Sequence, residues 1–165
     1  MARSVFEMLT VLVVDDSLHM RRLIARLLEV AGVGEIVVAG DGEEAWAKFL
    51  QHKPDIVITD AAMTPTDGFA LAQRLRAIGE DELRAVPIIM VSAHSELSAV
   101  ERARDVGVTD FLCKPVSPRL LYERLLGALN RPRKFIEAPT FAGPDRRTVS
   151  AEIEWPERRL PVSYI

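Results

Sequence analysis

The chain has 165 residues, a hydrophobic fraction of 48% and a formal net charge of −3 at pH 7. These values suit one globular domain with some length to spare, and the small net charge gives no support for a nucleic-acid partner. The single cysteine, Cys113, cannot form an internal disulfide, and neither a signal peptide nor a membrane-spanning run is recognisable, so we expect a cytoplasmic protein.

Short apolar runs alternate with longer amphipathic segments over residues 8–130. The runs are rich in Val and Ile and apolar on both faces, as is typical of central strands in a parallel sheet. In chain order, we predict strands over residues 10–14, 36–39, 56–59, 88–91 and 111–113. The amphipathic segments predict helices over residues 20–30, 43–51, 69–78, 97–106 and 120–129. Five units of strand followed by helix predict an α/β fold, with helices on both faces of the sheet.

The first predicted helix has recognisable ends. Met20, Ile24 and Leu27 recur at the spacing of one helix face. Ser17 precedes them and is a suitable N-cap, because its hydroxyl can accept a hydrogen bond from a free N–H group of the first turn. Gly32 is placed to end the helix.

Charge and proline content change near residue 130. Residues 1–129 carry 14 basic and 19 acidic side chains, whereas residues 130–165 carry 7 and 5, together with five of the ten prolines. Residues 131–165 cannot bury much surface by themselves, so we expect a C-terminal extension that is extended or partly disordered. Sparse apolar residues such as Phe141 and Trp155 leave two interpretations open: a solvated extension, or an arm that docks onto this domain or onto a partner.

Polar side chains stand at the carboxyl ends of four predicted strands. Asp15 and Asp16 follow the first strand, and Asp60 follows the third. Ser92 ends the fourth strand and Lys114 follows the fifth. Ligands of open α/β sheets bind at this edge, so the three carboxylates converge if the first and third strands are neighbours.

Clustered carboxylates repel one another, and a divalent cation relieves the repulsion. Mg²⁺ fits best because it prefers oxygen ligands, whereas the sequence has no cluster of His and Cys that would suit zinc or copper. Lys114 adds a positive charge and Ser92 a hydroxyl donor. Together these groups have the electrostatic character that phosphoryl transfer to Asp60 requires.

Five segments carry a resemblance to a known family: residues 11–17, 54–60, 63–68, 91–93 and 111–115. With these segments, residues 8–130 resemble the receiver domains of two-component response regulators, including the stand-alone chemotaxis type. The resemblance implies a flavodoxin-like, five-stranded parallel sheet of order 2-1-3-4-5. It also implies a signalling switch, not an enzyme, which takes a phosphoryl group from a histidine kinase or histidine phosphotransfer protein and passes the signal to a protein target.

The resemblance assigns a role to each residue of the predicted metal site. Asp60 would be the phospho-acceptor. Asp16 and Asp60 would bind Mg²⁺ directly, and Asp15 would do so mainly through water. The backbone carbonyl of Ala62 would complete the protein ligands.

The resemblance also describes the switch. Ser92 and Lys114 would bind the phosphoryl oxygens, and the Lys114–Pro115 peptide bond would be cis. Ser92 would move toward the phosphoryl group and vacate space for the ring of Phe111. The face formed by the fourth helix, the fifth strand and the fifth helix would then change, and a partner would bind to that face.

The loop after Asp60 departs from the family pattern. Its proline, Pro65, stands one position later than in many receivers. Ala62 stands where some receivers place a polar side chain, and alanine cannot orient an attacking water. We therefore expect slow self-dephosphorylation, which His94 could partly offset.

Of three other interpretations, only the first stays open, and the sequence argues against the other two. A magnesium-dependent phosphohydrolase with an aspartate nucleophile would need a second acid or base, for which Asp67 is the nearest candidate. A DNA-binding regulator would need a helix-turn-helix module, and residues 130–165 are not periodic enough to form one. An interaction module that is never phosphorylated would not need the complete set of acidic residues and lysine.

Overall fold

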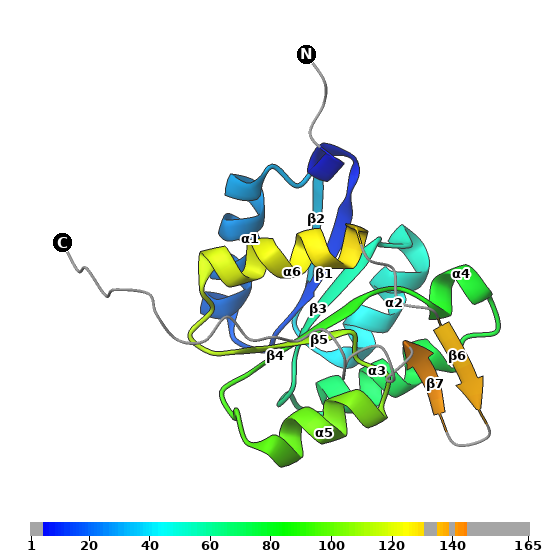
Figure 1. Ribbon diagram of the computed structural model, residues 1–165. Helices are drawn as coiled ribbons and strands as arrows, with labels where there is room; N and C mark the ends of the chain where they lie inside the picture. The colour runs from blue at the N-terminus through cyan, green and yellow to red at the C-terminus, as the bar shows by residue number, and fades with distance from the viewer. Residues whose placement is uncertain (1–4, 131–134, 139–140, 145–165) are drawn as a thin grey trace.

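The computed structural model describes residues 5–130, 135–138 and 141–144. Five parallel strands form one sheet of order β2-β1-β3-β4-β5 (Figure 1). The strands are β1 (Thr10–Val14), β2 (Glu35–Ala39), β3 (Ile56–Asp60), β4 (Ile88–Ser92) and β5 (Asp110–Cys113). This architecture confirms the predicted α/β fold and the strand order that the resemblance implies.

Helices cover both faces of the sheet (Figure 1). The long helices are α1 (Leu18–Ala31), α2 (Gly42–His52), α3 (Gly68–Arg76), α5 (Leu97–Asp105) and α6 (Pro118–Asn130). Their bounds agree with the predicted ones within two residues. The sequence did not predict the short helix α4 (Asp81–Arg84) or the 3₁₀ turn η1 (Val5–Met8). No helix in the described part of the chain is long and apolar enough to cross a membrane.

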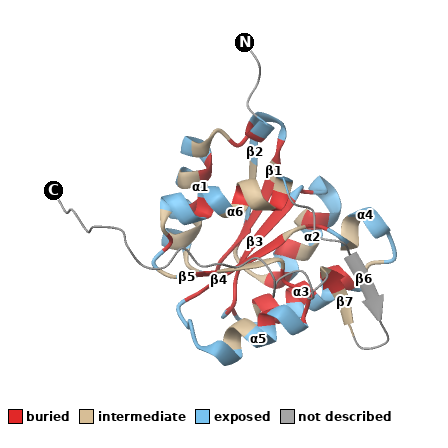
Figure 2. Cartoon of the chain, in the orientation of Figure 1, coloured by how far each residue is buried: buried red, intermediate tan, exposed pale blue. Residues whose placement is uncertain are grey.

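Alternating side chains of the strands build two hydrophobic clusters, one on each face of the sheet. Leu12 of β1 packs in one cluster with Phe49 of α2 and Leu75 of α3. Val11, its neighbour in β1, packs in the other with Leu28 of α1. This alternation follows from the two-residue period of a strand. The central strands β3 and β4 are buried along their whole length, as Figure 2 shows in red.

The ends of α1 form as predicted and position the loop that follows β1. The Ser17 hydroxyl accepts a hydrogen bond from the Met20 N–H group, and Gly32 adopts a left-handed conformation with φ of 88° at the C-cap. The cap starts the helix immediately after Asp15 and Asp16. It therefore holds both carboxylates at the carboxyl edge of the sheet.

The core begins before residue 8. The ring of Phe6 is 3% exposed and packs edge-on against Tyr122 of α6, with the ring centroids 5.3 Å apart. Its carbonyl accepts hydrogen bonds from the N–H groups of Leu9 and Gly34. The turn η1 therefore closes the end of the sheet opposite to the polar edge.

Two short segments of the C-terminal extension form strands, which the sequence analysis did not predict. Strands β6 (Phe135–Ala138) and β7 (Phe141–Pro144) pair in an antiparallel hairpin, with Phe135 opposite Pro144 and Ala138 opposite Phe141. Residues 131–134, 139–140 and 145–165, including Trp155, lie outside the described residues. The expectation of an extended or partly disordered chain stays a prediction for those segments.

Candidate functional site

Three carboxylates meet where β1 and β3 lie side by side. One oxygen from each of Asp15, Asp16 and Asp60 lies within 4.8 Å of the others. Asp15 and Asp60 are buried, at 1% and 6% exposure, whereas Asp16 is exposed. The convergence follows from the parallel pairing of β1 with β3, which brings the ends of the two strands together.

This cluster fits a hard divalent cation. The carboxylate oxygens come from the end of β3 and from the loop after β1, and the exposed Asp16 leaves one side open to solvent. Mg²⁺ binds through one or two carboxylates and keeps several waters, so it needs such a partly open set. The Ala62 residue, which would offer its carbonyl, is exposed two positions after Asp60.

Lys114 faces the buried carboxylates from the end of β5. Its Nζ atom lies 3.1 Å from Asp15 Oδ2 and 3.3 Å from Asp60 Oδ1. The other Asp15 oxygen accepts a hydrogen bond of 2.8 Å from the Ser17 N–H group. The two buried negative charges are therefore compensated by one ammonium and by backbone dipoles.

The pKa values of Asp60 and Lys114 are both raised, for different reasons. Burial raises the pKa of Asp60, and the neighbouring Asp15 charge raises it further against the opposing effect of Lys114. Burial lowers the pKa of Lys114, but its hydrogen bonds and charge interactions with Asp15 and Asp60 outweigh burial and raise the pKa overall. Lys114 therefore stays an ammonium at neutral pH.

One residue of this site was missed by the sequence analysis. Arg21 belongs to the polar face of α1, yet its Nη1 atom donates a hydrogen bond of 2.6 Å to the Asp15 carbonyl. The Asp15 N–H group donates to the Ala39 carbonyl of β2. The backbone of Asp15 is thus fixed from both sides. An arginine on a polar helix face carries no sequence signal for such a contact.

Ser92 and Phe111, the two residues that the resemblance implies for the switch, lie on the paired strands β4 and β5. Ser92 is 2% exposed, and its hydroxyl accepts a hydrogen bond of 3.0 Å from the His94 N–H group. Its carbonyl accepts the Lys114 N–H group at 2.8 Å, which joins β4 to the end of β5. Phe111 is half-buried and packs against the cluster beneath α3 and α5. The Lys114–Pro115 peptide bond is cis, as the resemblance implies.

The loop after β3 returns tightly over Asp60. A Cβ atom at Gly68 would lie 2.1 Å from the Asp60 carbonyl oxygen, so only glycine fits there. The Gly68 N–H group donates to the Ala61 carbonyl at 3.0 Å. Asp67 caps α3 by accepting the Ala70 N–H group at 2.8 Å. Its carboxylate is therefore already engaged in helix capping.

A pocket of about 390 Å³ opens beside Asp60, between the loops after β3 and β4. Ala61, Ala62, Ser92 and His94 contribute to its lining. Arg102 of α5 closes one side, with its guanidinium 4.0 Å from the ring centroid of Phe69. The small side chains at Ala61 and Ala62 leave space for another group near the Asp60 carboxylate.

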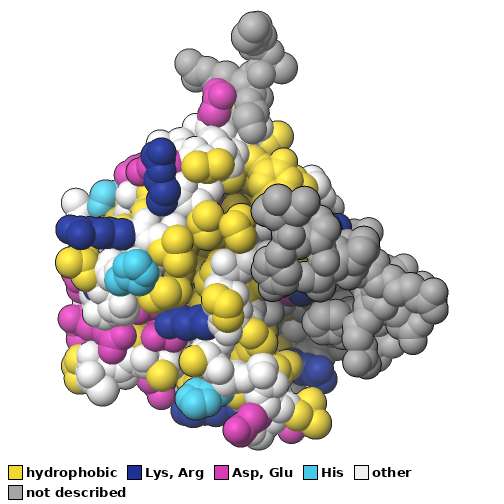
Figure 3. Space-filling view, turned by 90° about the vertical axis from the view of Figure 1, so that its left-hand side faces the viewer, with side chains coloured by type: hydrophobic (Ala, Val, Ile, Leu, Met, Phe, Trp, Pro, Cys, Tyr) yellow, Lys and Arg dark blue, Asp and Glu magenta, His cyan; other side chains and the backbone are white. Residues whose placement is uncertain are grey.

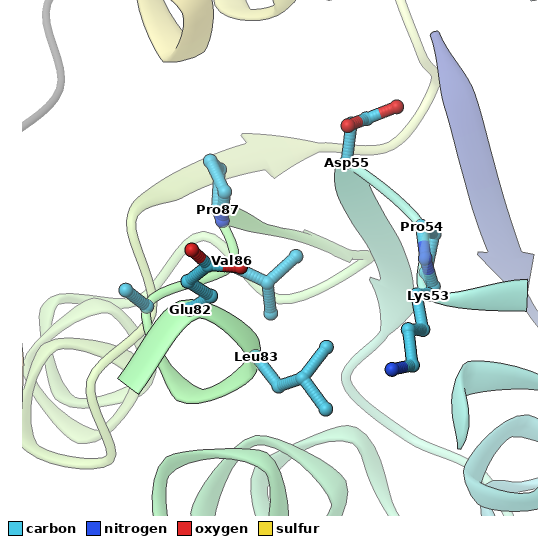
Figure 4. Close-up of a pocket in the computed structure, with 8 residues that line it drawn as sticks. Lys53, Pro54, Asp55, Glu82, Leu83, Val86 and Pro87 are labelled. Atoms are coloured by element: carbon cyan, nitrogen blue, oxygen red, sulfur yellow. The ribbon is translucent and has the colours of Figure 1, made fainter. Parts of the chain in front are cut away.

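A second pocket lies at the opposite ends of the strands and does not belong to this site. It measures about 280 Å³ and lies between the start of β3 and the short helix α4 (Figure 4). Pro54 and Pro87, which precede β3 and β4, help to line it, together with Lys53 and Leu83. The Asp55 carboxylate at its rim accepts the Thr10 N–H group at 2.8 Å, so its role is to join β1 to β3.

The surface around the carboxyl edge is mixed in character. Three leucines in the first turns of the helices that follow β1, β4 and β5 are exposed: Leu18 (52%), Leu97 (72%) and Leu120 (42%). Figure 3 shows the side of the molecule where the loops after β4 and β5 lie, with hydrophobic side chains beside basic and acidic ones. Such a surface suits a transient protein interface.

The fold and the site define a flavodoxin-like α/β domain with an acidic, lysine-bearing centre at the carboxyl edge of its sheet. A family model described as the response regulator receiver domain matches residues 11–126. The chain belongs to this family, as the resemblance predicted. Receiver domains are signalling proteins that interact with kinases or phosphotransfer proteins and with downstream targets.

Individual relatives agree with this assignment. Over 116 residues, the chain is 36% identical to chemotaxis protein CheY1 of Helicobacter pylori, which covers 69% of this chain and 91% of that protein. It is 39% identical over 123 residues to the phosphate regulon transcriptional regulatory protein PhoB of Pseudomonas aeruginosa, covering 74% of this chain and 52% of PhoB. The chain thus spans about half the length of PhoB.

A solved structure supports the fold independently. Chemotaxis protein CheY4 of Vibrio cholerae superposes with a TM-score of 0.68 at 31% identity, covering 73% of this chain and 98% of CheY4. The match accounts for almost all of CheY4. It leaves about a quarter of this chain outside the common fold.

Proposed function

We propose that this protein is a cytoplasmic signalling switch that accepts a phosphoryl group on Asp60, with Mg²⁺ as cofactor. The donor would be a phosphohistidine of a kinase or of a histidine phosphotransfer protein. A downstream protein would bind to the altered face formed by α5, β5 and α6. The observation that carries the proposal is the position of Lys114 Nζ, 3.3 Å from a buried Asp60 oxygen and 3.1 Å from Asp15.

The residues perform the transfer by position and charge. An Asp60 carboxylate oxygen attacks phosphorus while the bond from phosphorus to the donor nitrogen breaks. Lys114 would stabilise the negative charge that the phosphoryl oxygens bring to the site, and Asp15 keeps the ammonium in place. Mg²⁺, held by Asp15, Asp16 and Asp60 with the Ala62 carbonyl, would neutralise the cluster when bound.

The switch would follow from a change of partner at Ser92. Its hydroxyl now accepts a hydrogen bond from the His94 N–H group. The hydroxyl can also donate one hydrogen bond. A charged phosphoryl oxygen is a strong acceptor, so the Ser92 hydroxyl would turn toward it and donate to it. Phe111 is half-buried next to this strand and could move into the space released. A shift from 1:99 to 99:1 needs about 5.5 kcal/mol of differential interaction.

The phosphohydrolase interpretation receives no support from the site. Such an enzyme needs a free acid or base near the nucleophile. Asp67, the nearest candidate, caps α3 and lies 3.6 Å from the Arg102 guanidinium. A long-lived aspartyl phosphate is therefore the product that this arrangement favours.

The test is phosphorylation of the whole chain by acetyl phosphate with Mg²⁺, followed by intact mass. We expect one adduct of a phosphoryl group on the parent protein and none on Asp60→Asn. The control variant Asp55→Asn removes a carboxylate at the opposite end of β3 and should keep the adduct. An unmodified parent, or an equal adduct on Asp60→Asn, would refute the assignment. Continuous turnover of the donor without an adduct would favour the hydrolase.

A further inference from the structure

The hairpin β6–β7 is seated on the turn between α5 and β5. A Cβ atom at Gly107 would lie 2.5 Å from the Ala142 carbonyl oxygen, and a Cβ atom at Gly143 would lie 2.7 Å from the Gly107 Cα atom. Two backbones therefore touch without any side chain between them. This approach is possible only because both positions are glycine.

The turn that receives the hairpin is itself held rigidly. Gly107 follows the end of α5 and has φ of +86°, and its N–H group donates to the Arg104 carbonyl at 3.1 Å. Its own carbonyl accepts a hydrogen bond of 2.9 Å from Arg76 Nε. The flanking residues Val106 and Val108 are buried in the core. Because the turn is held by these hydrogen bonds and by the core, a side chain added at the contact would displace the hairpin rather than the turn.

Arg76 fixes the turn at Gly107 by hydrogen bonds from its side chain. It is 4% exposed, and Nη1 donates to the carbonyls of Arg84 and Val86 at 2.5 and 2.7 Å. One buried guanidinium thus joins the end of α3, the α4 turn and the hairpin seat. The carbonyls of Gly107, Arg84 and Val86 compensate the buried guanidinium, and the Gly107 bond holds the turn in place beneath the hairpin.

The seat lies at the far end of the helix that starts beside the phosphorylation site. The loop from Ser92 leads into α5 at Leu97, and α5 ends two residues before Gly107. Four residues after Gly107, β5 reaches Phe111, and Lys114 follows. A displacement of α5 or β5 that begins at Ser92 or Phe111 would therefore act on two elements that flank the turn under the hairpin.

We propose that the surface around Gly107 is a docking site for this chain's own β6–β7 hairpin, and that phosphorylation of Asp60 weakens this docking. The second part rests on the proposed function. In this structure the hairpin is seated on Gly107 and the Ser92 hydroxyl accepts a hydrogen bond from the His94 N–H group. The hairpin would bind the unphosphorylated arrangement more tightly than the phosphorylated one. By linkage, phosphorylation of Asp60 would then favour release of the hairpin.

The experiment is hydrogen exchange with mass spectrometry on the full chain. In the Gly143→Ala variant we expect the amides of residues 104–109, 135–138 and 141–143 to exchange about tenfold faster than in the parent. The matched control is Gly127→Ala, whose added Cβ meets nothing within 4 Å, and which should leave both segments unchanged. Unchanged exchange over residues 104–109 in Gly143→Ala would overturn the docking.

The coupling is measured on the same proteins with acetyl phosphate and Mg²⁺. Phosphorylated parent protein should show faster exchange over residues 135–138 and 141–143, whereas Asp60→Asn should not respond. Equal or slower exchange in the phosphorylated protein would overturn the coupling. Intact mass separates the two hypotheses: a missing adduct removes the proposed function and the coupling with it, whereas docking is judged by Gly143→Ala without a donor.

Discussion

The Lys114 ammonium donates a hydrogen bond of 3.1 Å to the carboxylate of Asp15, a residue 99 positions earlier in the chain. This bond joins the ends of β1 and β5. The same Nζ atom lies 3.3 Å from Asp60, so one cation serves two buried anions. In the metal-free protein, Lys114 therefore carries out part of the charge compensation that Mg²⁺ would provide. We therefore expect Mg²⁺, when it binds, to share the Asp15 and Asp60 carboxylates with the Lys114 ammonium, which weakens the binding of each cation.

Replacing Lys114 by methionine should destabilise the metal-free protein by about 2 kcal/mol. Removing one partner of a buried pair costs about 3–5 kcal/mol, and the partial exposure of the lysine reduces this figure. With saturating Mg²⁺ the loss should be smaller, because the metal then compensates the carboxylates. Urea denaturation in EDTA and in Mg²⁺ measures both values.

The surface variant Lys48→Met is the control for the loss of a lysine, since Lys48 pairs with Glu44 in an exposed position on α2. It should change stability by less than about 0.5 kcal/mol in either buffer. The competition is contradicted if Lys114→Met binds Mg²⁺ more weakly than the parent, because removal of the competing ammonium should strengthen binding.

Replacing Asp60 by asparagine should stabilise the metal-free protein at pH 7. Burial and the Asp15 charge raise the pKa of Asp60, so the folded state holds a proton there more readily than the unfolded state. Its contribution to folding is favourable at low pH. It is lost as the pH rises from about 4, the ordinary carboxyl value, through the higher pKa of the folded state.

The advantage of Asp60→Asn should therefore grow with pH across this window and shrink toward zero near pH 4. Thermal unfolding in EDTA at several pH values measures it, and Glu101→Gln on the exposed face of α5 controls for the loss of one negative charge. Repulsion alone would make Asp15→Asn equally stabilising. However, Asp15 accepts hydrogen bonds from Lys114 and Ser17, so we expect that variant to gain less.

The polar edge could be predicted from the sequence because its signals are local. Asp15, Asp60 and Lys114 each follow a short apolar run, and in a parallel sheet the ends of such runs share one edge. The Ser17 cap is equally local, since it depends on residues three positions apart. These local signals do not give the distances between side chains of different strands. That oxygens of Asp15, Asp16 and Asp60 lie within 4.8 Å of one another could be predicted only with the strand order as well.

Contacts between distant segments gave no such signal. Arg21 reads as a solvated side chain, and only the fold turns it toward the Asp15 carbonyl. Strands β6 and β7 are too short to be recognised from an alternation of apolar and polar residues. The hairpin also contacts Gly107, which lies in a distant part of the chain. Gly68 looks like a turn glycine, yet it is required by its approach to Asp60.

Replacing Gly68 by alanine should cost about 3 kcal/mol of stability and reduce phosphorylation. The new Cβ would lie 2.1 Å from the Asp60 carbonyl oxygen, and backbone cannot give way as a flexible side chain can. Gly127→Ala, in open space on α6, should be neutral or slightly stabilising. Urea denaturation compares them, and an equal effect of both variants would contradict the steric argument.

The side chain at position 62 should control how long the phosphorylated state lasts. Ala62 is exposed at the pocket beside Asp60, and its methyl group cannot hold a water in line with the phosphorus atom. Hydrolysis of the aspartyl phosphate needs an oriented water, so the parent protein should stay phosphorylated for minutes or longer. Ala62→Asn places an amide there and should shorten the lifetime about tenfold. Intact mass followed over time after removal of the donor measures both lifetimes. Ala70→Asn, on the exposed side of α3, controls for the added amide, and a parent lifetime of seconds would contradict the argument.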